Sequence, residues 1–393
     1  MMHERGKLVL GFAAVAAGVY LAAKAAYKYW WHEEDVGESP DDVGMEPEVE
    51  KDEAPAESPK SEGLVAVHGA HDIVEGDSRV SWFKALVQRY AIGCGAFGRI
   101  MAVTDPFTQD HYALKRITLD KLDDYGRVAV ERELWVGRFW ASRQAFLCPT
   151  LGGFRDQLNL YLVTPFAEGR SLENIVQELN FNMTRFICAQ VLIALEHLHQ
   201  VGITHRDVKL ENVFLDASGY LMLGDFGLSA EQGADYTPGA GTLEYLPTEA
   251  VLDPKKHTPE FEAPGDIWSW GVLLYKCITH GRTPFSNSAG KILKGRIRLA
   301  NWDRRPETIT PVVMELLNSI FKKDPSVRPS PREIAEHEFF DGFDWEALKA
   351  RAMPSPLLHE EIPMLDLGEV GPTAHPHKYF ALGDVEWVEG NFF

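Results

Sequence analysis

One stretch, "HRDVKLENVFLDASGYLMLGDFG", constrains the fold more than any other part of this chain. Asp207, Lys209 and Asn212 stand before an apolar run, and Asp225 follows it. The run "VFLDASGYLMLG" predicts a short hairpin that turns at "DASG". Because a hairpin of this length brings its two ends together, two acids, a lysine and an asparagine are expected at a single site.

A glycine-rich loop precedes this stretch in "YAIGCGAFGRIMAV", where Gly93, Gly95 and Gly98 form the pattern GxGxxG. Dinucleotide-binding folds share that spacing, but they need a helix directly after it. Here "RIMAV" and then "HYALKRI" follow, and both are typical of strands. A hairpin closing over phosphates fits better, since glycine lets the backbone approach phosphate oxygens closely. Lys115 on the third strand would then reach the α- and β-phosphates.

Lys115 needs an acidic partner, and the segment "DDYGRVAVERELWVGRFW" predicts a helix that could supply one. Glu131 and Glu133 are both candidates. We favour Glu131, because Leu134 and Trp135 then lie three and four residues further on, on a packed face.

Taken together, the motifs resemble those of the eukaryotic protein kinases. "GCGAFGRI", "YALK", "HRDVKLEN" and "GDFG" occur in the family's order, and "PTE" at Pro247–Glu249 stands where the family has APE. The segment "HEFFDGFDWEALKARAMPSPLL" resembles the AGC group, whereas "GTLEYLPTE" is similar to the Aurora group. The resemblance implies an α+β, bilobal protein-kinase fold, with a small antiparallel-sheet N-lobe carrying one helix and a larger, mainly helical C-lobe.

The resemblance also implies roles for the residues of the opening stretch, with ATP and Mg²⁺ as cofactors. Asp207 would accept the proton of the substrate hydroxyl, and Lys209 would contact the γ-phosphate. Asn212 and Asp225 would hold Mg²⁺, which prefers oxygen ligands. Lys115 and its acid would complete the catalytic set.

By motif position, the residues around the adenine of ATP are Ile100 and Ala113 above, Phe214 below, Thr164 at the gatekeeper position, and Pro165 and Ala167 at the hinge between the lobes. Proline is unusual at its hinge position. The family uses only a carbonyl there, and proline lacks the N–H but keeps the C=O. The Ala167 N–H would make the other hinge contact.

The function implied is a serine/threonine protein kinase acting on protein substrates. Lys209, two residues after Asp207, and Thr242 both match the serine/threonine type. Glu249 and Arg328 match an acid–arginine pair of the helical lobe. The alternative is a membrane-anchored pseudokinase scaffold, and a small-molecule kinase is a third reading. All the catalytic residue types are present, which favours the active enzyme.

Charge and composition, together with the extent of the kinase resemblance, divide the chain into five parts. The net charge of −19 argues against a general nucleic-acid binder. Thirteen acids and two lysines fall between residues 32 and 63, a composition that cannot form a core. The predicted parts are a membrane anchor (1–31), an acidic disordered linker (32–63), a connecting segment (64–89), the kinase domain (90–340) and an AGC-like tail (341–393).

The anchor prediction depends on the uncharged run Leu8–Ala23. Its 16 residues make about 24 Å of helix, short of a bilayer core, but extension to Trp31 gives about 36 Å if Lys24 and Lys28 snorkel. A cleaved signal peptide and a buried helix are the rival readings. We favour a retained single span with the kinase domain facing the cytosol.

The tail ends in "VEWVEGNFF". In AGC kinases an aromatic motif near the end docks on the small lobe. Trp387, Phe392 and Phe393 could dock there in the same way, or the terminus could be frayed.

Overall fold

The computed structural model describes residues 77–95, 98–231, 241–252, 262–285, 291–358, 362, 364–365, 367–368 and 385–388. All of them belong to the unit formed by residues 69–393. The predicted anchor and acidic linker lie outside the described residues, as do Phe392 and Phe393. Among the helices that are described, none combines the length and the apolar character needed to cross a bilayer.

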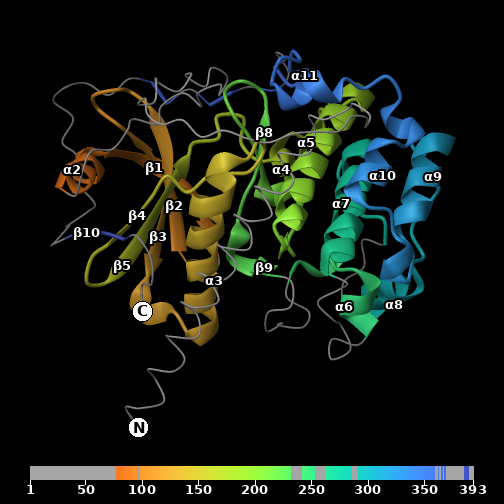
Figure 1. The fold of residues 1–393 in the computed structure, drawn as a ribbon, viewed down its shortest axis with the longest axis horizontal. Coiled ribbons are helices and arrows are strands. Elements are labelled where there is room, and N and C mark those ends of the chain that lie inside the picture. Colours follow the sequence, from red (N-terminus) through yellow and green to blue (C-terminus); the bar gives the residue numbers. More distant parts are fainter. Residues whose placement is uncertain are drawn as a thin grey trace, which may run out of the picture. The chain divides into compact units, whose positions relative to one another are not determined.

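A six-stranded antiparallel sheet forms the smaller lobe (Figure 1). Its strand order is β1-β2-β3-β5-β4-β10, and each neighbouring pair is antiparallel. The glycine pattern lies at the β1–β2 hairpin, where Gly95 pairs with Gly98, and a strand follows it, as predicted. The strands are β1 (Val87–Gly95), β2 (Gly98–Thr104), β3 (His111–Thr118), β4 (Gly152–Arg155), β5 (Asn159–Pro165) and β10 (Glu386–Trp387).

Helices pack on both faces of this sheet, because its strands alternate apolar side chains between the two faces. The helix α3 (Asp124–Trp135) covers one face through residues such as Val130. The helix α2 (Asp77–Ala85) covers the other, and its Phe83 ring stacks on Phe154 at 4.2 Å. The predicted helix of this lobe is α3, and α2 is a further helix that lies in the predicted connecting segment. α2 escaped prediction because its sequence, "DSRVSWFKA", has no clear helical period of apolar residues.

The larger lobe is mainly helical, as predicted, and α5 and α7 lie at its centre (Figure 1). The predicted buried helix "DIWSWGVLLY" falls in α7, where Trp268 and Trp270 are fully buried. Its helices are α4 (Leu172–Ile175), α5 (Phe181–Gln200), α6 (Thr248–Leu252), α7 (Glu262–Ile278), α8 (Lys291–Leu299), α9 (Pro311–Ile320), α10 (Pro331–Ala335) and α11 (Trp345–Lys349). Two two-stranded antiparallel sheets accompany them. In one, β6 (Ile203–Thr204) pairs with β9 (Ala230–Glu231), and in the other, β7 (Val213–Leu215) pairs with β8 (Leu221–Leu223).

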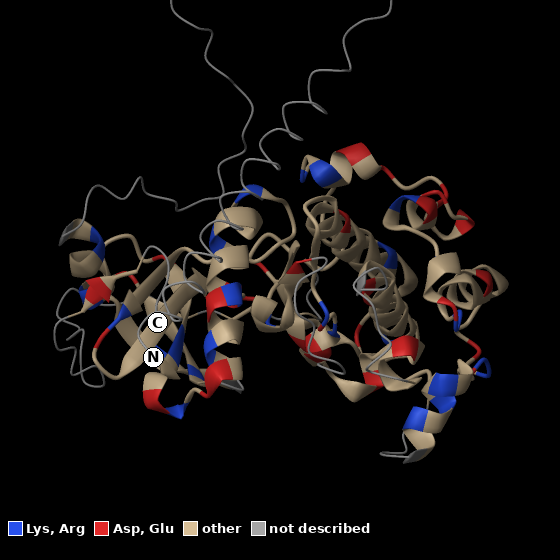
Figure 2. Cartoon of the chain, turned by 60° about the horizontal axis from the view of Figure 1, so that its bottom comes forward, with Lys and Arg blue, Asp and Glu red and all other residues tan. Residues whose placement is uncertain are grey.

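Acidic and basic residues are interspersed along both lobes (Figure 2), and several of them form ion pairs. The predicted Glu249–Arg328 pair is one of these ion pairs. Arg328 donates to both carboxylate oxygens of Glu249 at 2.7 and 2.6 Å, and its side chain is fully buried. This bidentate contact connects α6 to the turn before α10.

The C-terminal segment adds the last strand to the sheet. β10 pairs with β4, and the Trp387 ring meets Phe154 edge-to-face at 5.0 Å. The guanidinium groups of Arg79 and Arg138 lie 4.6 and 4.8 Å from the Trp387 ring centroid. Docking of the tail on the small lobe is thus confirmed for Trp387.

We expect Trp387→Ala to destabilise the protein by roughly 2 kcal/mol, because a half-buried indole and its two cation–π contacts are lost. The midpoint of thermal unfolding should fall by several degrees. Glu386→Ala is the matched control, since the Glu386–Arg155 pair is exposed and should contribute little. Equal midpoints for Trp387→Ala and Glu386→Ala would show that the docked indole does not stabilise the lobe.

Candidate active site

Lys115 and an acid of α3 form the ion pair that the sequence predicts, but the acid is Glu133. The Lys115 ammonium lies 2.7 Å from both Glu133 carboxylate oxygens, and the two side chains are only 13% and 12% exposed. The choice of Glu131 was wrong.

The helical period of α3 explains this correction. The buried residues of the helix follow the spacing of one face: Gly126, Ala129, Val130, Glu133 and Leu134. Glu131 lies off that face, and the partly buried Trp135 marks its edge. Asp123 caps the start of the helix, since its side chain accepts from the Gly126 N–H.

The Asp225 carboxylate lies close to this ion pair. Its Oδ1 lies 3.9 Å from the Lys115 ammonium, and its side chain is 46% exposed. Burial alone would lower the pKa of Lys115, but the charges of Glu133 and Asp225 outweigh burial and raise it. Lys115 therefore keeps its positive charge beside an open carboxylate, as an anion-binding lysine requires.

The catalytic-loop residues converge on the buried Asp207 carboxylate. Lys209 donates to its Oδ2 at 2.6 Å, and Asn212 donates to the same atom at 3.0 Å. Thr242 donates to Oδ1 from its hydroxyl and its backbone N–H, at 3.0 and 3.2 Å. These donors fix the direction of the carboxylate, and the structure brings Asp207 together with Lys209, Asn212 and Thr242, as the motifs indicated.

A second buried acid, Asp266 of α7, holds the backbone of this loop. Its oxygens accept from the N–H groups of His205 and Arg206 at 2.8 Å each, and from the His199 ring at 2.8 Å. Burial would raise the pKa of Asp266, but the His199 hydrogen bond and the neighbouring histidines lower it. Arg206 has a φ of +67°, a strained conformation that these bonds maintain. Sequence analysis included Asp266 in the predicted buried helix but gave no role to Asp266 or His199.

The hairpin between the two polar groups forms as predicted. The Gly224 N–H donates to the Asn212 carbonyl at 2.9 Å, which places Asn212 next to the residue before Asp225. Asp225 itself has a φ of +62°, in the left-handed region. Asn212 uses its amide nitrogen on Asp207, so its amide oxygen remains for a cation. A carboxylate and an amide oxygen are a donor set that fits Mg²⁺.

The residues predicted to surround adenine lie on adjoining elements. Ile100 pairs with Lys115 across β2 and β3, and Ala113 pairs with Thr164 across β3 and β5. Phe214, on β7, lies so close to Gly224 that a Cβ there would be 3.2 Å from its ring. The strand pairing thus places Ile100 beside Lys115 and Ala113 beside Thr164, whereas the contact of these residues and of Phe214 with adenine stays a prediction.

The segment after β5 contains the two predicted hinge contacts. Pro165 ends β5 opposite Tyr112, and the Ala167 carbonyl accepts from the Arg170 N–H at 3.0 Å. The C-terminal segment reaches this hinge, because the Leu365 N–H donates to the Glu168 carbonyl at 2.7 Å. The tail therefore contacts the hinge as well as β4, and Arg89 of β1 donates to the Leu367 carbonyl.

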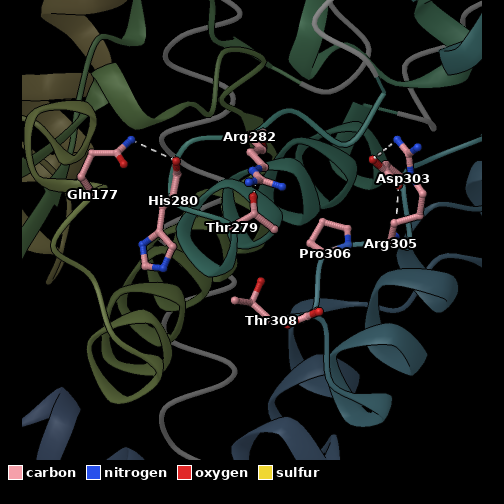
Figure 3. Close-up of a pocket in the computed structure, with 9 residues that line it drawn as sticks. Gln177, Thr279, His280, Arg282, Asp303, Arg305, Pro306 and Thr308 are labelled. Atoms are coloured by element: carbon pink, nitrogen blue, oxygen red, sulfur yellow. Dashed lines mark hydrogen bonds and ion pairs between the residues drawn. The ribbon is translucent and has the colours of Figure 1, made fainter.

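A cavity of about 660 Å³ lies at the C-terminal end of α7 (Figure 3). None of the predicted site residues lines it. Most of the residues that line it carry polar side chains, and Arg305 donates to Asp303 there at 2.7 Å. The lining residues are Gln177, Thr279, His280, Arg282, Asp303, Arg305, Pro306, Glu307 and Thr308.

Comparison with known proteins agrees with this geometry. The family "Protein kinase domain" matches residues 86–340. That match begins next to β1 at Val87, slightly before the predicted start at residue 90. The match spans both the lysine–glutamate pair and the catalytic loop.

Curated relatives are serine/threonine kinases of the AGC group, although an Aurora-like segment is not confirmed. Ribosomal protein S6 kinase alpha-3 of Homo sapiens is 32% identical over 73% of this chain and 39% of its own length. Serine/threonine-protein kinase AtPK1/AtPK6 of Arabidopsis thaliana is 31% identical over 67% of this chain and 57% of its own. Serine/threonine-protein kinase SCH9 of Candida albicans is 31% identical over 67% of this chain and 35% of its own. The chain thus spans about a third to somewhat over half of these relatives, and it belongs to the protein kinase family.

Proposed function

We propose that this chain is a serine/threonine protein kinase, which transfers the γ-phosphate of ATP to hydroxyl groups of proteins. The observation that carries the proposal is the assembly of two groups: the Lys115–Glu133 pair beside Asp225, and the Asp207 carboxylate with its three side-chain partners. The family uses ATP and Mg²⁺, and two of the relatives reported above are named as serine/threonine-protein kinases.

In this reaction each residue has a role that its position supports. Lys115, aimed by Glu133, binds the phosphate chain of ATP. Asp207 orients the substrate hydroxyl and accepts its proton, while Lys209 offsets the charge on the transferring group. Asn212 and Asp225 would hold Mg²⁺, which supplies charge neutralisation between the phosphates when bound. Catalysis of this kind depends mostly on positioning and electrostatics.

A nucleotide-binding scaffold without activity is the rival reading. Asp207 is buried, only 6% exposed, and a lysine, an asparagine and a threonine together fix its orientation. A protein that only binds nucleotide does not need this arrangement. This arrangement favours the enzyme.

We also propose that residues 1–31 anchor the protein to a membrane, with the kinase domain in the cytosol. The support is the uncharged run Leu8–Ala23 and the aromatic and basic residues that follow it. ATP is available in the cytosol, which agrees with that orientation.

Asp207→Asn should lower kcat by about a thousandfold or more, because the general base is lost while the side-chain shape is kept. Phosphate transfer from radiolabelled ATP to a serine- and threonine-containing test protein measures this. Thermal unfolding should stay within a few degrees of the wild type. A folded Asp207→Asn protein with undiminished kcat would rule out Asp207 as the base.

Glu133→Gln and Glu131→Gln form a matched pair on the same helix. Glu133→Gln should lower kcat/KM by about 10- to 1000-fold, since Lys115 loses the charge that aims it. Glu131→Gln should remain within about twofold of the wild type. If both variants lose activity equally, the ion pair is not what distinguishes Glu133.

Carbonate extraction tests the anchor. The full-length protein should stay in the membrane pellet, with the kinase domain open to added protease from the cytosolic side. A variant lacking residues 1–31 should move to the supernatant. Recovery of the full-length protein in the supernatant, or a mature N-terminus near Ala26, would contradict a retained span.

A further inference from the structure

One segment of the large lobe departs from the acidic character of the chain. Between Asp266 and Asp303 the sequence contains six bases and no acid, in a protein that has 58 acids and 39 bases. Four of the six bases belong to α8, "KILKGRIRL", and they form the blue group at the lower right of Figure 2. The charge of α8 is therefore opposite in sign to the net charge of −19.

The helix α8 has one buried face and one exposed face, and both carry apolar side chains. Leu293 and Ile297, four residues apart, are 7% and 0% exposed and pack in the core of the large lobe. Ile292 and Leu299, seven residues apart, share another face of the helix and are 60% and 62% exposed. The core thus covers two of these large apolar side chains and leaves the other two in solvent.

Basic side chains flank the two exposed apolar residues. Successive residues of a helix are about 100° apart, so Arg296 lies on one side of Ile292 and Leu299, and Lys294 and Arg298 lie on the other. Lys294 and Arg298 are exposed, and Arg296 is half-buried. Neither Lys294 nor Arg296 forms an ion pair with a residue that the structure describes. Their charges therefore remain open to a partner.

The neighbouring helix α6 extends this surface. Arg298 donates to the Val251 carbonyl from two of its nitrogens, at 3.4 and 3.3 Å. The next residue, Leu252, is 51% exposed. A third exposed apolar side chain therefore belongs to the helix that α8 contacts.

This combination of side chains fits an anionic lipid surface better than an acidic peptide. A peptide is bound tightly where a groove buries its side chains, but the cavity described above is lined by residues before and after α8 and by none of its own. A headgroup layer needs no groove. It accepts bases at the phosphates and short apolar side chains between them, which is the arrangement on α8.

We propose that α8 is a peripheral membrane-contact site, at which Lys294, Arg296 and Arg298 bind anionic phospholipid headgroups and Ile292 and Leu299 enter the headgroup layer. The inference rests on the proposed function in one respect, since the proposed anchor keeps a bilayer near the kinase domain. Each base close to such a surface strengthens binding about fivefold. An anionic surface repels a chain of net charge −19, so contact is favoured only where the local charge is positive.

Photocrosslinking of the full-length protein tests the contact. Leu299→benzoylphenylalanine places a photoreactive group on α8, and the protein is mixed with vesicles of phosphatidylcholine alone or with phosphatidylserine added at about one lipid in three. Mass spectrometry then measures the yield of phospholipid adducts at position 299, which should be about tenfold higher with phosphatidylserine. Val327→benzoylphenylalanine is the control, because Val327 is 60% exposed but lies outside α8, and it should give little adduct with either vesicle.

A charge variant tests the role of the bases. Lys294→Gln combined with Arg296→Gln should lower the adduct yield at position 299 by roughly thirtyfold, at about fivefold per base. Lys322→Gln combined with Lys323→Gln removes the same charge from two exposed lysines elsewhere and should leave the yield within about twofold. Phosphate transfer to a test protein without vesicles should be equal in both variants, which shows that they are folded.

Equal adduct yields at positions 299 and 327, or equal yields with the two kinds of vesicle, would overturn the lipid site. Capture of polyglutamate in place of phospholipid, when both are present, would assign α8 to an acidic segment and overturn it as well. Carbonate extraction, which removes peripheral proteins, reports on the anchor separately. A protein that carbonate releases but that still forms phosphatidylserine adducts would contradict the anchor and support α8. A protein that resists carbonate but forms no adduct would do the reverse.

Discussion

The buried carboxylate of Asp266 is the contact on which the rest of the site depends. It accepts hydrogen bonds from His205, Arg206 and His199, and so fixes a backbone that Arg206 would not adopt unaided. A buried charge is costly without such partners, which explains why three donors surround it. Because Asp266 belongs to α7, a largely buried helix at the centre of the large lobe, the catalytic loop is fixed to the hydrophobic core.

The small lobe meets this rigid part through a few polar contacts. Lys115 comes from the sheet, Glu133 from α3 and Asp225 from the end of the β7–β8 hairpin. Apolar packing alone would let these three elements shift relative to one another, whereas the ion pair gives them one preferred arrangement. The bidentate Glu249–Arg328 contact does the same for the segment that carries Thr242 and Glu244.

Much of this site could be predicted from sequence, because short spacings determine local geometry. Asp207, Lys209 and Asn212 are close along the chain, and the hairpin to Asp225 has an unambiguous turn. The choice between Glu131 and Glu133 failed because it depends on the rotation of α3, which the sheet decides. Asp266 was missed because its partners are some sixty residues away, and such pairings leave no trace in a single sequence.

The strand order has a consequence for synthesis of the chain. β4 obtains its outer partner, β10, from a segment about 230 residues further along. At roughly 5–20 residues per second, the ribosome needs on the order of tens of seconds to deliver it. Throughout that interval Gly152–Arg155 presents an unpaired edge, the kind of surface that recruits foreign strands. A nascent chain of this design is therefore most in need of chaperone protection after its small lobe has emerged and before its last strand arrives.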